Sequence, residues 1–464
     1  MGVSTVTAAR ILEGQLRGET GEENWLSFER LPHVALAKTY NTNQQVPDSA
    51  GTMTAIVTGE KTRAGVLSVD ASVPRSDHAA VKGHRLGTLL EQAEKLGLST
   101  GVVTTARLTH ATPAACYAHS PERGWEDDSD LPDAARRADF PDIARQLIEF
   151  PFGDGLEVAM GGGRRHFLPR ESTDPEQPEK SGRRSDGRDL TAEWTRRHPN
   201  AAYVWNRKQL EALDAASTDH VLGLFQRSHM QWEADRGQDL AGEPSLSEMT
   251  EFAIDLLSRN PRGYFLMVEA GRIDHGHHAG NAYRALTDTV ELSRAVGAAL
   301  AVVDLNQTLV VATADHSHVF TIAGYSRRGN DILGPVVHND DRGGGPGKLA
   351  RDALGMPYTT LGYQNGPGYL GASSDQPEGP KHFPHYSRSW SGGPLGRADL
   401  EAIDTTAAGY LQESAYPLVS ETHGGEDVPV YAAGPGAERI HGVMEQNRLF
   451  HAIRDAFHWT AQAR

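Results

Sequence analysis

Two stretches of the chain decide the fold, YFLMVEAGRIDHGHH (264–278) and TLVVATADHSH (308–318). Each begins with a continuous apolar run, which is typical of a strand covered on both faces of a sheet. Each ends in carboxylates and imidazoles, and open α/β sheets bind their ligands beyond the carboxyl ends of the strands. We therefore expect a buried sheet with a polar site at one edge.

Outward from these stretches, strand-like runs alternate with helical patterns. Further strands are expected at 99–106, 156–162 and 428–434, and helices at 1–16, 87–97, 245–260, 282–304 and 441–457. Ser245 and Glu248 have the spacing of a capping box at the start of one helix. This alternation predicts an α/β fold with a large, mostly parallel sheet flanked by helices on both faces.

Two polar stretches interrupt the pattern within what we expect to be a single domain, residues 1–464. Residues 161–189 are rich in Gly, Pro and Arg, which predicts a surface loop, and the basic pairs at 164–165 and 183–184 are expected to be solvated. Residues 324–399 are too many for a structureless loop in a compact domain. They are interpreted as an inserted loop-rich subdomain near the site or at a subunit interface.

Composition excludes several classes of protein. The chain has 45 Lys and Arg against 61 Asp and Glu, a net charge of −16, which disfavours a general binder of nucleic acid or anionic membranes. No window approaches the length of a membrane span. The single cysteine, Cys116, excludes an internal disulfide and is expected to be a small buried residue. The 21 histidines, several beside Asp, indicate metal sites.

The clusters after the two strands contain metal-ligand chemistry. Asp274 and His278 are four residues apart, so a helical turn would place them on one face. An imidazole and a carboxylate suit Zn²⁺, whereas Glu269 offers a hard oxygen suited to Mg²⁺. Asp315 and His316 form the second cluster. One Asp–His pair alone would more often be structural, but two such clusters after buried strands favour metal binding.

Ser49 and His423, which lie elsewhere in the chain, become candidate site residues when they are considered together with these clusters. In VPDSAGTMTA, Asp48 suits a helix N-cap and Ser49 the first turn, where the helix dipole would stabilise an alkoxide. Taken alone, Ser49 is better explained by an ordinary capping serine. No G-x-S-x-G elbow surrounds it, so a metal is the natural activator. His423, in a Gly-rich turn, is a candidate further ligand of the Asp274 and His278 metal.

The segment RLTHATPAACYAHSPER (107–123) follows the strand at 99–106. His110 and Thr112 are positioned to face the site. Arg123 could bind phosphate oxygens with two parallel hydrogen bonds, a geometry that the guanidinium favours. This segment therefore adds a candidate anion-binding group to the candidate metal ligands.

Together these residues resemble the alkaline phosphatases, and most closely their animal-type branch. The resemblance covers nearly the whole chain and rests on QQVPDSAGTMTA, THATPAACYAHSPER, LSRNPRGYFLMVEAGRIDHGHH, VVATADHSHVF and ETHGGEDVPVYAAGP. It implies metal-dependent hydrolysis of phosphate monoesters through a phosphoserine, with two Zn²⁺ and one Mg²⁺. The implied roles are: nucleophile, Ser49; first zinc, Asp274, His278 and His423; second zinc, Asp315 and His316; magnesium, Thr112 and Glu269; phosphate clamp, Arg123; near phosphate, His275; near magnesium, His110.

The chain departs from the family pattern in two places. In the family, a strand ending in Gly-Asp-Gly lies centrally in the sheet, and its Asp bridges the second zinc and magnesium; here Met1 stands just after that position. We expect either a start codon assigned too late or a truncated gene whose product is weak or inactive, and we favour the first. Gln226 stands where an acidic calcium ligand is expected, so calcium is not carried over.

Other properties are implied by the resemblance alone. It implies a homodimer, small phosphate monoesters as substrates, and a periplasmic or extracellular location, although residues 1–16 lack the features of a signal peptide. The nearest rival function is a phosphodiesterase or sulfatase of the same superfamily. The rival from another class is an inactive metal- or phosphate-binding remnant.

Overall fold

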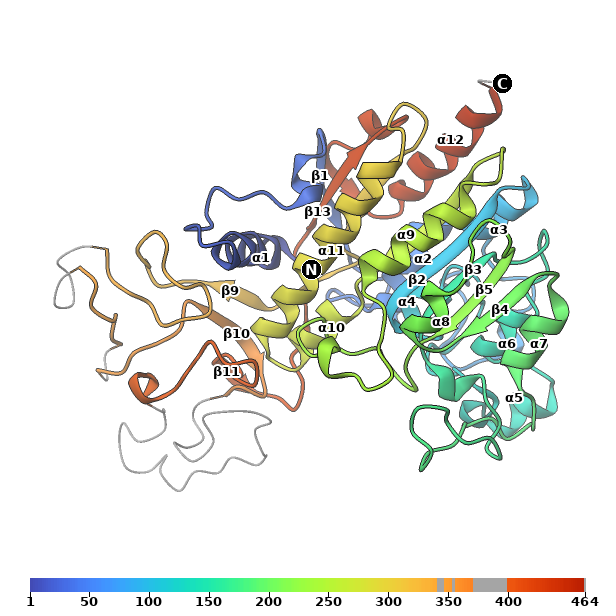
Figure 1. The fold of residues 1–464 in the computed structure, drawn as a ribbon, viewed down its shortest axis with the longest axis horizontal. Helices are drawn as coiled ribbons and strands as arrows, with labels where there is room; N and C mark the ends of the chain where they lie inside the picture. The colour runs from blue at the N-terminus through green and yellow to red at the C-terminus, as the bar shows by residue number, and fades with distance from the viewer. Residues whose placement is uncertain (340–345, 353–354, 370–398, 463–464) are drawn as a thin grey trace.

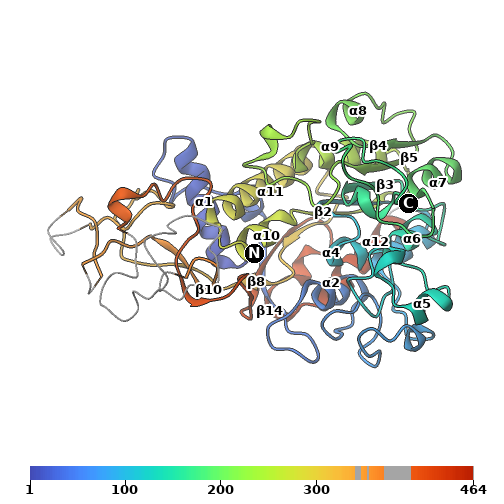
Figure 2. The ribbon, with the colours of Figure 1, turned by 90° about the horizontal axis from the view of Figure 1, so that it is seen from below.

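The computed structural model describes residues 1–339, 346–352, 355–369 and 399–462. Its largest sheet has five strands, all parallel, in the spatial order β4 (Ala201–Val204), β5 (His220–Leu224), β3 (Val158–Gly162), β2 (Ser99–Arg107) and β6 (Tyr264–Glu269). Helix α9 (Leu246–Leu257) packs on one side of this sheet and α4 (Ala111–Ala114) on the other (Figure 2). The predicted helix-covered parallel sheet is therefore confirmed.

A second sheet is mixed, in the order β14 (Gly442–Glu445), β1 (His33–Lys38), β13 (Val428–Ala433) and β7 (Val310–Thr313). β13 runs antiparallel to both neighbours, and β14 runs parallel to β1. The helix expected at 441–457 is wrong at its beginning, because β14 pairs with the edge of β1 and α12 (Arg448–Gln462) starts only after it. Pairing with a distant strand overrode the local helical pattern.

The two sheets are not joined. β6 is an edge strand of the parallel sheet and β7 is an edge strand of the mixed sheet. No backbone hydrogen bonds pair these two strands. A cavity of about 440 Å³ lies between them, lined mainly by apolar side chains of both strands, with Met1 and Glu269 also on its wall. Accordingly, the residues of β6 and β7 are only half-buried, whereas those of β3 and β5 are buried.

The other helices cover these sheets and connect their strands: α1 (Val3–Leu16), α2 (Ser49–Thr58), α3 (Leu89–Lys95), α5 (Asp133–Arg137), α6 (Ile143–Ile148), α7 (Leu190–Arg197), α8 (Arg207–Glu211), α10 (Arg272–His278) and α11 (Ala282–Val302). The long helix α11 packs against α1, α9 and α10 (Figure 1). Because α10 directly follows β6, this packing fixes the segment that holds the predicted metal ligands.

Residues 324–399 lie only partly within the described residues. Within the described part, β10 (Leu361–Gly366) pairs with β9 (Phe320–Ile322) and β11 (Ser414–Pro417). The stretch 161–189 corrects one expectation. Arg164 and Arg184 are fully buried rather than solvated, because each is paired with carboxylates: Arg164 with Asp174, and Arg184 with Asp142. These pairs satisfy the desolvated guanidinium groups.

The state of Cys116 and the length of the apolar helices also bear on the sequence predictions. Cys116 is a buried free thiol, as predicted, and burial raises the pKa of this thiol above its usual range. None of the helices in the described part of the chain is both long and apolar enough to cross a lipid bilayer.

Candidate metal centre and active site

Ser49 lies at the first position of α2, as the sequence predicted. The side chain of Asp48 caps this helix by accepting the backbone N–H of Gly51 at 3.0 Å. Ser49 is buried, and its Oγ lies 3.0 Å from Nε2 of His316, which follows β7. The start of α2 therefore places a hydroxyl group against an imidazole from the second sheet.

Two short elements bring the candidate ligands together. α10 presents Asp274 and His278 on one face, with Oδ1 of Asp274 3.4 Å from Nε2 of His278. His423 arrives on β12 (His423–Gly424), which pairs antiparallel with β8 (Ser317–His318) so that His423 stands opposite His318. This ladder, formed by residues more than 100 positions apart, completes the cluster.

The Oδ1 atom of Asp274 is the centre of this cluster. Four imidazole nitrogens surround it: Nε2 of His318 at 3.0 Å, His423 at 3.3 Å, His278 at 3.4 Å and His316 at 3.9 Å. Yet this oxygen is buried and accepts no well-aligned hydrogen bond. Imidazole nitrogens gathered around a carboxylate form the donor set that suits Zn²⁺, so these residues fit a metal centre.

Charge and burial shift the pKa values of the carboxyl groups here. Burial alone would raise the pKa of Asp274, but the charges of His278 and His318 outweigh it and hold that pKa well below its usual range. Burial raises the pKa of Asp315, although the buried amino group of Met1, which donates to the carbonyl oxygen of His316 at 2.6 Å, opposes it. Burial also raises the pKa of Glu269 to about 7.

Arg123 lies beside the start of α2. Its Nη1 lies 3.2 Å from Oδ2 of Asp48, and its Nη2 lies 3.2 Å from Nε2 of His110. The ring of His110 is in turn 5.4 Å from that of His275. Asp48 therefore links the cap of the Ser49 helix to a guanidinium group that can bind an anion.

Thr112 and Glu269 meet at the end of β6. Thr104 donates a short hydrogen bond to the Glu269 carboxylate. The Thr112 side chain lies close enough to this carboxylate to oppose the rise in its pKa. Oxygen donors of this kind are the ligands that Mg²⁺ prefers. Every residue selected from the sequence thus lies in one region, while the role of each stays a prediction.

Comparison with known proteins decides the family. The profile of the alkaline phosphatase family matches residues 1–459. The chain belongs to the alkaline phosphatase family. The tissue-nonspecific alkaline phosphatase isozyme of Gallus gallus is 46% identical to this chain over 462 residues, which cover 98% of this chain and 82% of the relative. The alkaline phosphatase of Gadus morhua is 44% identical over 459 residues, covering 98% of this chain and 88% of the relative.

Solved alkaline phosphatase structures share the fold. The enzyme from Thermus thermophilus superposes with a TM-score of 0.64 at 23% identity, covering all of this chain and 93% of that one. The enzyme from the Antarctic bacterium TAB5 gives a TM-score of 0.61 at 22% identity, covering 99% and 95%. A variant of the TAB5 enzyme with bound Mg is similar to the same extent. The chain is therefore a phosphomonoester hydrolase of this family with residue groups that can hold metal ions.

Sequence reasoning missed two residues of this cluster, His318 and Glu421. His318 lies between two carboxylates, 3.0 Å from Asp274 and 2.8 Å from Oε2 of Glu421, and is fully buried. Glu421 also accepts the backbone N–H of Val319 at 2.7 Å. The spacing His316-Ser317-His318 was visible, but only the β8–β12 pairing shows that the second histidine also faces Asp274.

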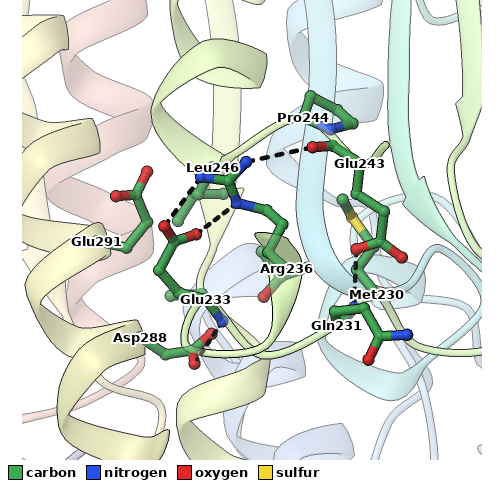
Figure 3. A pocket seen from close by; sticks show the side chains of 11 residues that line it. Met230, Gln231, Glu233, Arg236, Glu243, Pro244, Leu246, Asp288 and Glu291 are labelled. Carbon is green, nitrogen blue, oxygen red and sulfur yellow. Dashed lines mark hydrogen bonds and ion pairs between the residues drawn. The ribbon is translucent and has the colours of Figure 1, made fainter. Parts of the chain in front are cut away.

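A second, smaller cavity shares none of the predicted site residues. Figure 3 shows four carboxylates on its wall, those of Glu233, Glu243, Asp288 and Glu291. Arg236 pairs with Glu233 at 2.7 Å, and the carboxylates also accept backbone N–H groups. At about 10 Å³ the cavity has room for about one water molecule. It is a satisfied polar cluster beside the phosphatase site.

Proposed function

We propose that this phosphatase forms a phosphoserine at Ser49 and binds two Zn²⁺ and one Mg²⁺. Asp274, His278 and His423 would hold the first zinc, Asp315 and His316 the second, and Thr112 and Glu269 the magnesium. When bound, such ions lower the pKa of hydroxyl groups and water and neutralise phosphate charge. The observation that carries the proposal is the Ser49 hydroxyl, 3.0 Å from the imidazole of a predicted zinc ligand.

The chain's own residues perform the remaining steps. Arg123, held by Asp48, binds the phosphate oxygens of the ester, and His275 lies near the same phosphate. Ser49 Oγ attacks phosphorus while the bond to the leaving alcohol breaks. Water then attacks the phosphoserine, which releases inorganic phosphate and restores the hydroxyl group. His110 contributes by accepting a hydrogen bond from Nη2 of Arg123, while Nη1 of Arg123 pairs with Asp48.

The test is to replace Ser49 by Ala and trap the enzyme by acid quenching after it is mixed with 4-nitrophenyl phosphate. Wild type should carry a stable phosphoseryl group, and Ser49→Ala should carry none while turnover falls by several orders of magnitude. Unchanged turnover of Ser49→Ala would remove the nucleophile assignment. Comparing 4-nitrophenyl phosphate with its diester and sulfate analogues separates a phosphomonoesterase from a diesterase or a sulfatase.

Three further properties belong to the same proposal. We propose that the chain acts as a homodimer, in the periplasm or outside the cell, as the resemblance to the family implies. We also propose that residues 1–464 form a single domain, with residues 324–399 as its inserted subdomain. Sedimentation of the purified protein and fractionation of the producing cell test the first two.

A further inference from the structure

Three histidines from different segments meet beside Arg123. They are His110 after β2, His229 after β5, and His275 on α10. One ring nitrogen of each lies within 4.8 Å of the others, and the ring centroids of His229 and His275 are 4.0 Å apart. The side chains of His110, His229 and His275 are each partly exposed. His229 has no part in the centre described above.

The hydrogen bonds of His229 conflict with one another. Its Nδ1 lies 3.2 Å from the backbone nitrogen of Arg107, and its Nε2 makes a short contact with Nη1 of the same arginine. Both arginine groups can only donate. Burial, and then the charges of His275 and Arg107, lower the pKa of His229, so the ring is neutral and has one lone pair. If Nδ1 accepts from the backbone, the Nε2–H has no acceptor.

His110 is in a similar position. Its Nε2 lies 3.2 Å from Nη2 of Arg123, which is again a donor, so the ring proton of His110 is on Nδ1. That Nδ1 is buried and has no hydrogen-bond partner. Two imidazole N–H groups are therefore left without an acceptor in the same small region.

Arg107 supplies a third unused donor. Two of its nitrogens bind the Glu126 carboxylate, at 2.7 and 2.6 Å, and this fork fixes the guanidinium group. The remaining Nη1 points at His229. Unsatisfied donors of this kind cost free energy unless an acceptor is supplied. Negatively charged oxygens are the acceptors that pair most strongly with such donors.

We propose that His110, His229 and Arg107 form an oxyanion subsite beside Arg123, which takes a second anionic group of the substrate. The inference rests on the proposed phosphatase function and narrows its substrates to phosphate esters that carry a further phosphoryl or carboxylate group. Three clustered imidazoles can also hold a metal ion. Here both nitrogens of His229 face arginine donors, and the two guanidinium groups favour an anion over a cation.

The test compares two non-reacting ligands on the metal-loaded enzyme, orthophosphate and methylenediphosphonate, by isothermal titration calorimetry. His229→Leu removes the donor, and His229→Gln keeps an N–H group as the matched control. In His229→Leu, the dissociation constant of methylenediphosphonate should rise about tenfold, the effect of one lost hydrogen bond to a charged group. That of orthophosphate should change less than twofold, and His229→Gln should fall between wild type and His229→Leu.

Other outcomes would overturn the inference. Equal weakening of both ligands, or no change in either, removes the second subsite. A wild-type enzyme that binds one more Zn²⁺ or Co²⁺ per chain than His229→Leu shows that the cluster holds a cation instead. If wild type fails to hydrolyse 4-nitrophenyl phosphate, the proposed function fails, while the calorimetric comparison still decides on the subsite.

Discussion

Replacing Arg123 by Ala is expected to weaken phosphate binding by about two orders of magnitude. Asp48 is itself fixed, because its carboxylate accepts the backbone N–H groups of Gly51 at 3.0 Å and Gly65 at 2.9 Å. The ion pair with Asp48 at 3.2 Å therefore positions the guanidinium group before the substrate arrives. A positioned group loses little freedom on binding, so most of its interaction energy reaches the affinity.

The magnitude follows from the number of bonds. A guanidinium group can give phosphate two charge-assisted hydrogen bonds, each worth about 1.5–3 kcal/mol. Arg123 is 23% exposed, so the lower value applies to both bonds. Their loss amounts to about 3 kcal/mol, or roughly a hundredfold in the dissociation constant.

The assay is the inhibition constant of orthophosphate against 4-nitrophenyl phosphate, because it reports binding without the chemical step. Arg123→Lys keeps the charge but not the fork, so it should recover about half of the lost free energy. Asp48→Asn keeps an oxygen for the helix cap but loses the ion pair, and should weaken inhibition by about three- to tenfold. An inhibition constant of Arg123→Ala within twofold of wild type would refute the assignment of Arg123 as the phosphate clamp.

Three further predictions follow from other parts of the molecule. Burial raises the pKa of Glu94 to about 8, above its unfolded value. The cost of ionising this carboxyl group in the folded protein therefore grows as the pH rises from the unfolded pKa to about 8, and it disappears at lower pH. Glu94→Gln should therefore raise the urea midpoint at pH 9, by the equivalent of about 1–2 kcal/mol, and leave it unchanged at pH 5. Arg164→Leu leaves the Asp174 carboxylate buried without its partner and should cost about 3–5 kcal/mol in urea unfolding, whereas the partly exposed Arg165 changed to Leu should cost less than 1 kcal/mol. Dialysis against EDTA should abolish hydrolysis, and Zn²⁺ together with Mg²⁺ should restore it, whereas Mg²⁺ alone should not.

The centre of the site could be predicted from the sequence because its signals are local. Continuous apolar runs marked β6 and β7, so the polar clusters at the ends of both strands were visible. The sequence did not show that these clusters meet from the edge strands of two separate sheets. The spacing of Asp274 and His278 needs one helical turn, which α10 provides. The Asp48 cap of α2 likewise follows from a single residue before an apolar run.

What the sequence did not show depends on contacts between distant segments. The partners of His318 are Asp274 and Glu421, and β8 and β12 must pair before these residues meet. The expected start of the last helix likewise forms strand β14, because this segment pairs with β1. Arg164 was predicted to be solvated, since nothing local indicates that Asp174 closes over it. A local pattern does not show which distant segment an element or side chain contacts, and such a contact can change the type of the element, as in β14.

The net charge of the chain is negative, whereas the groups named at the proposed site are positive. An anion binds only if the local attraction by these groups exceeds the long-range repulsion by the net charge. The net charge of −16 repels phosphate esters at long range, but this repulsion is screened beyond about 8 Å at physiological salt. Inside that distance the proposed site offers Arg123, Arg107 and the N-terminal end of α2, whose unpaired N–H groups favour negative charge. We therefore expect KM for a doubly charged ester to fall, rather than rise, as salt is increased from 10 to 200 mM. A rise in KM over that range would show that attraction between the site and its substrate already acts at long range.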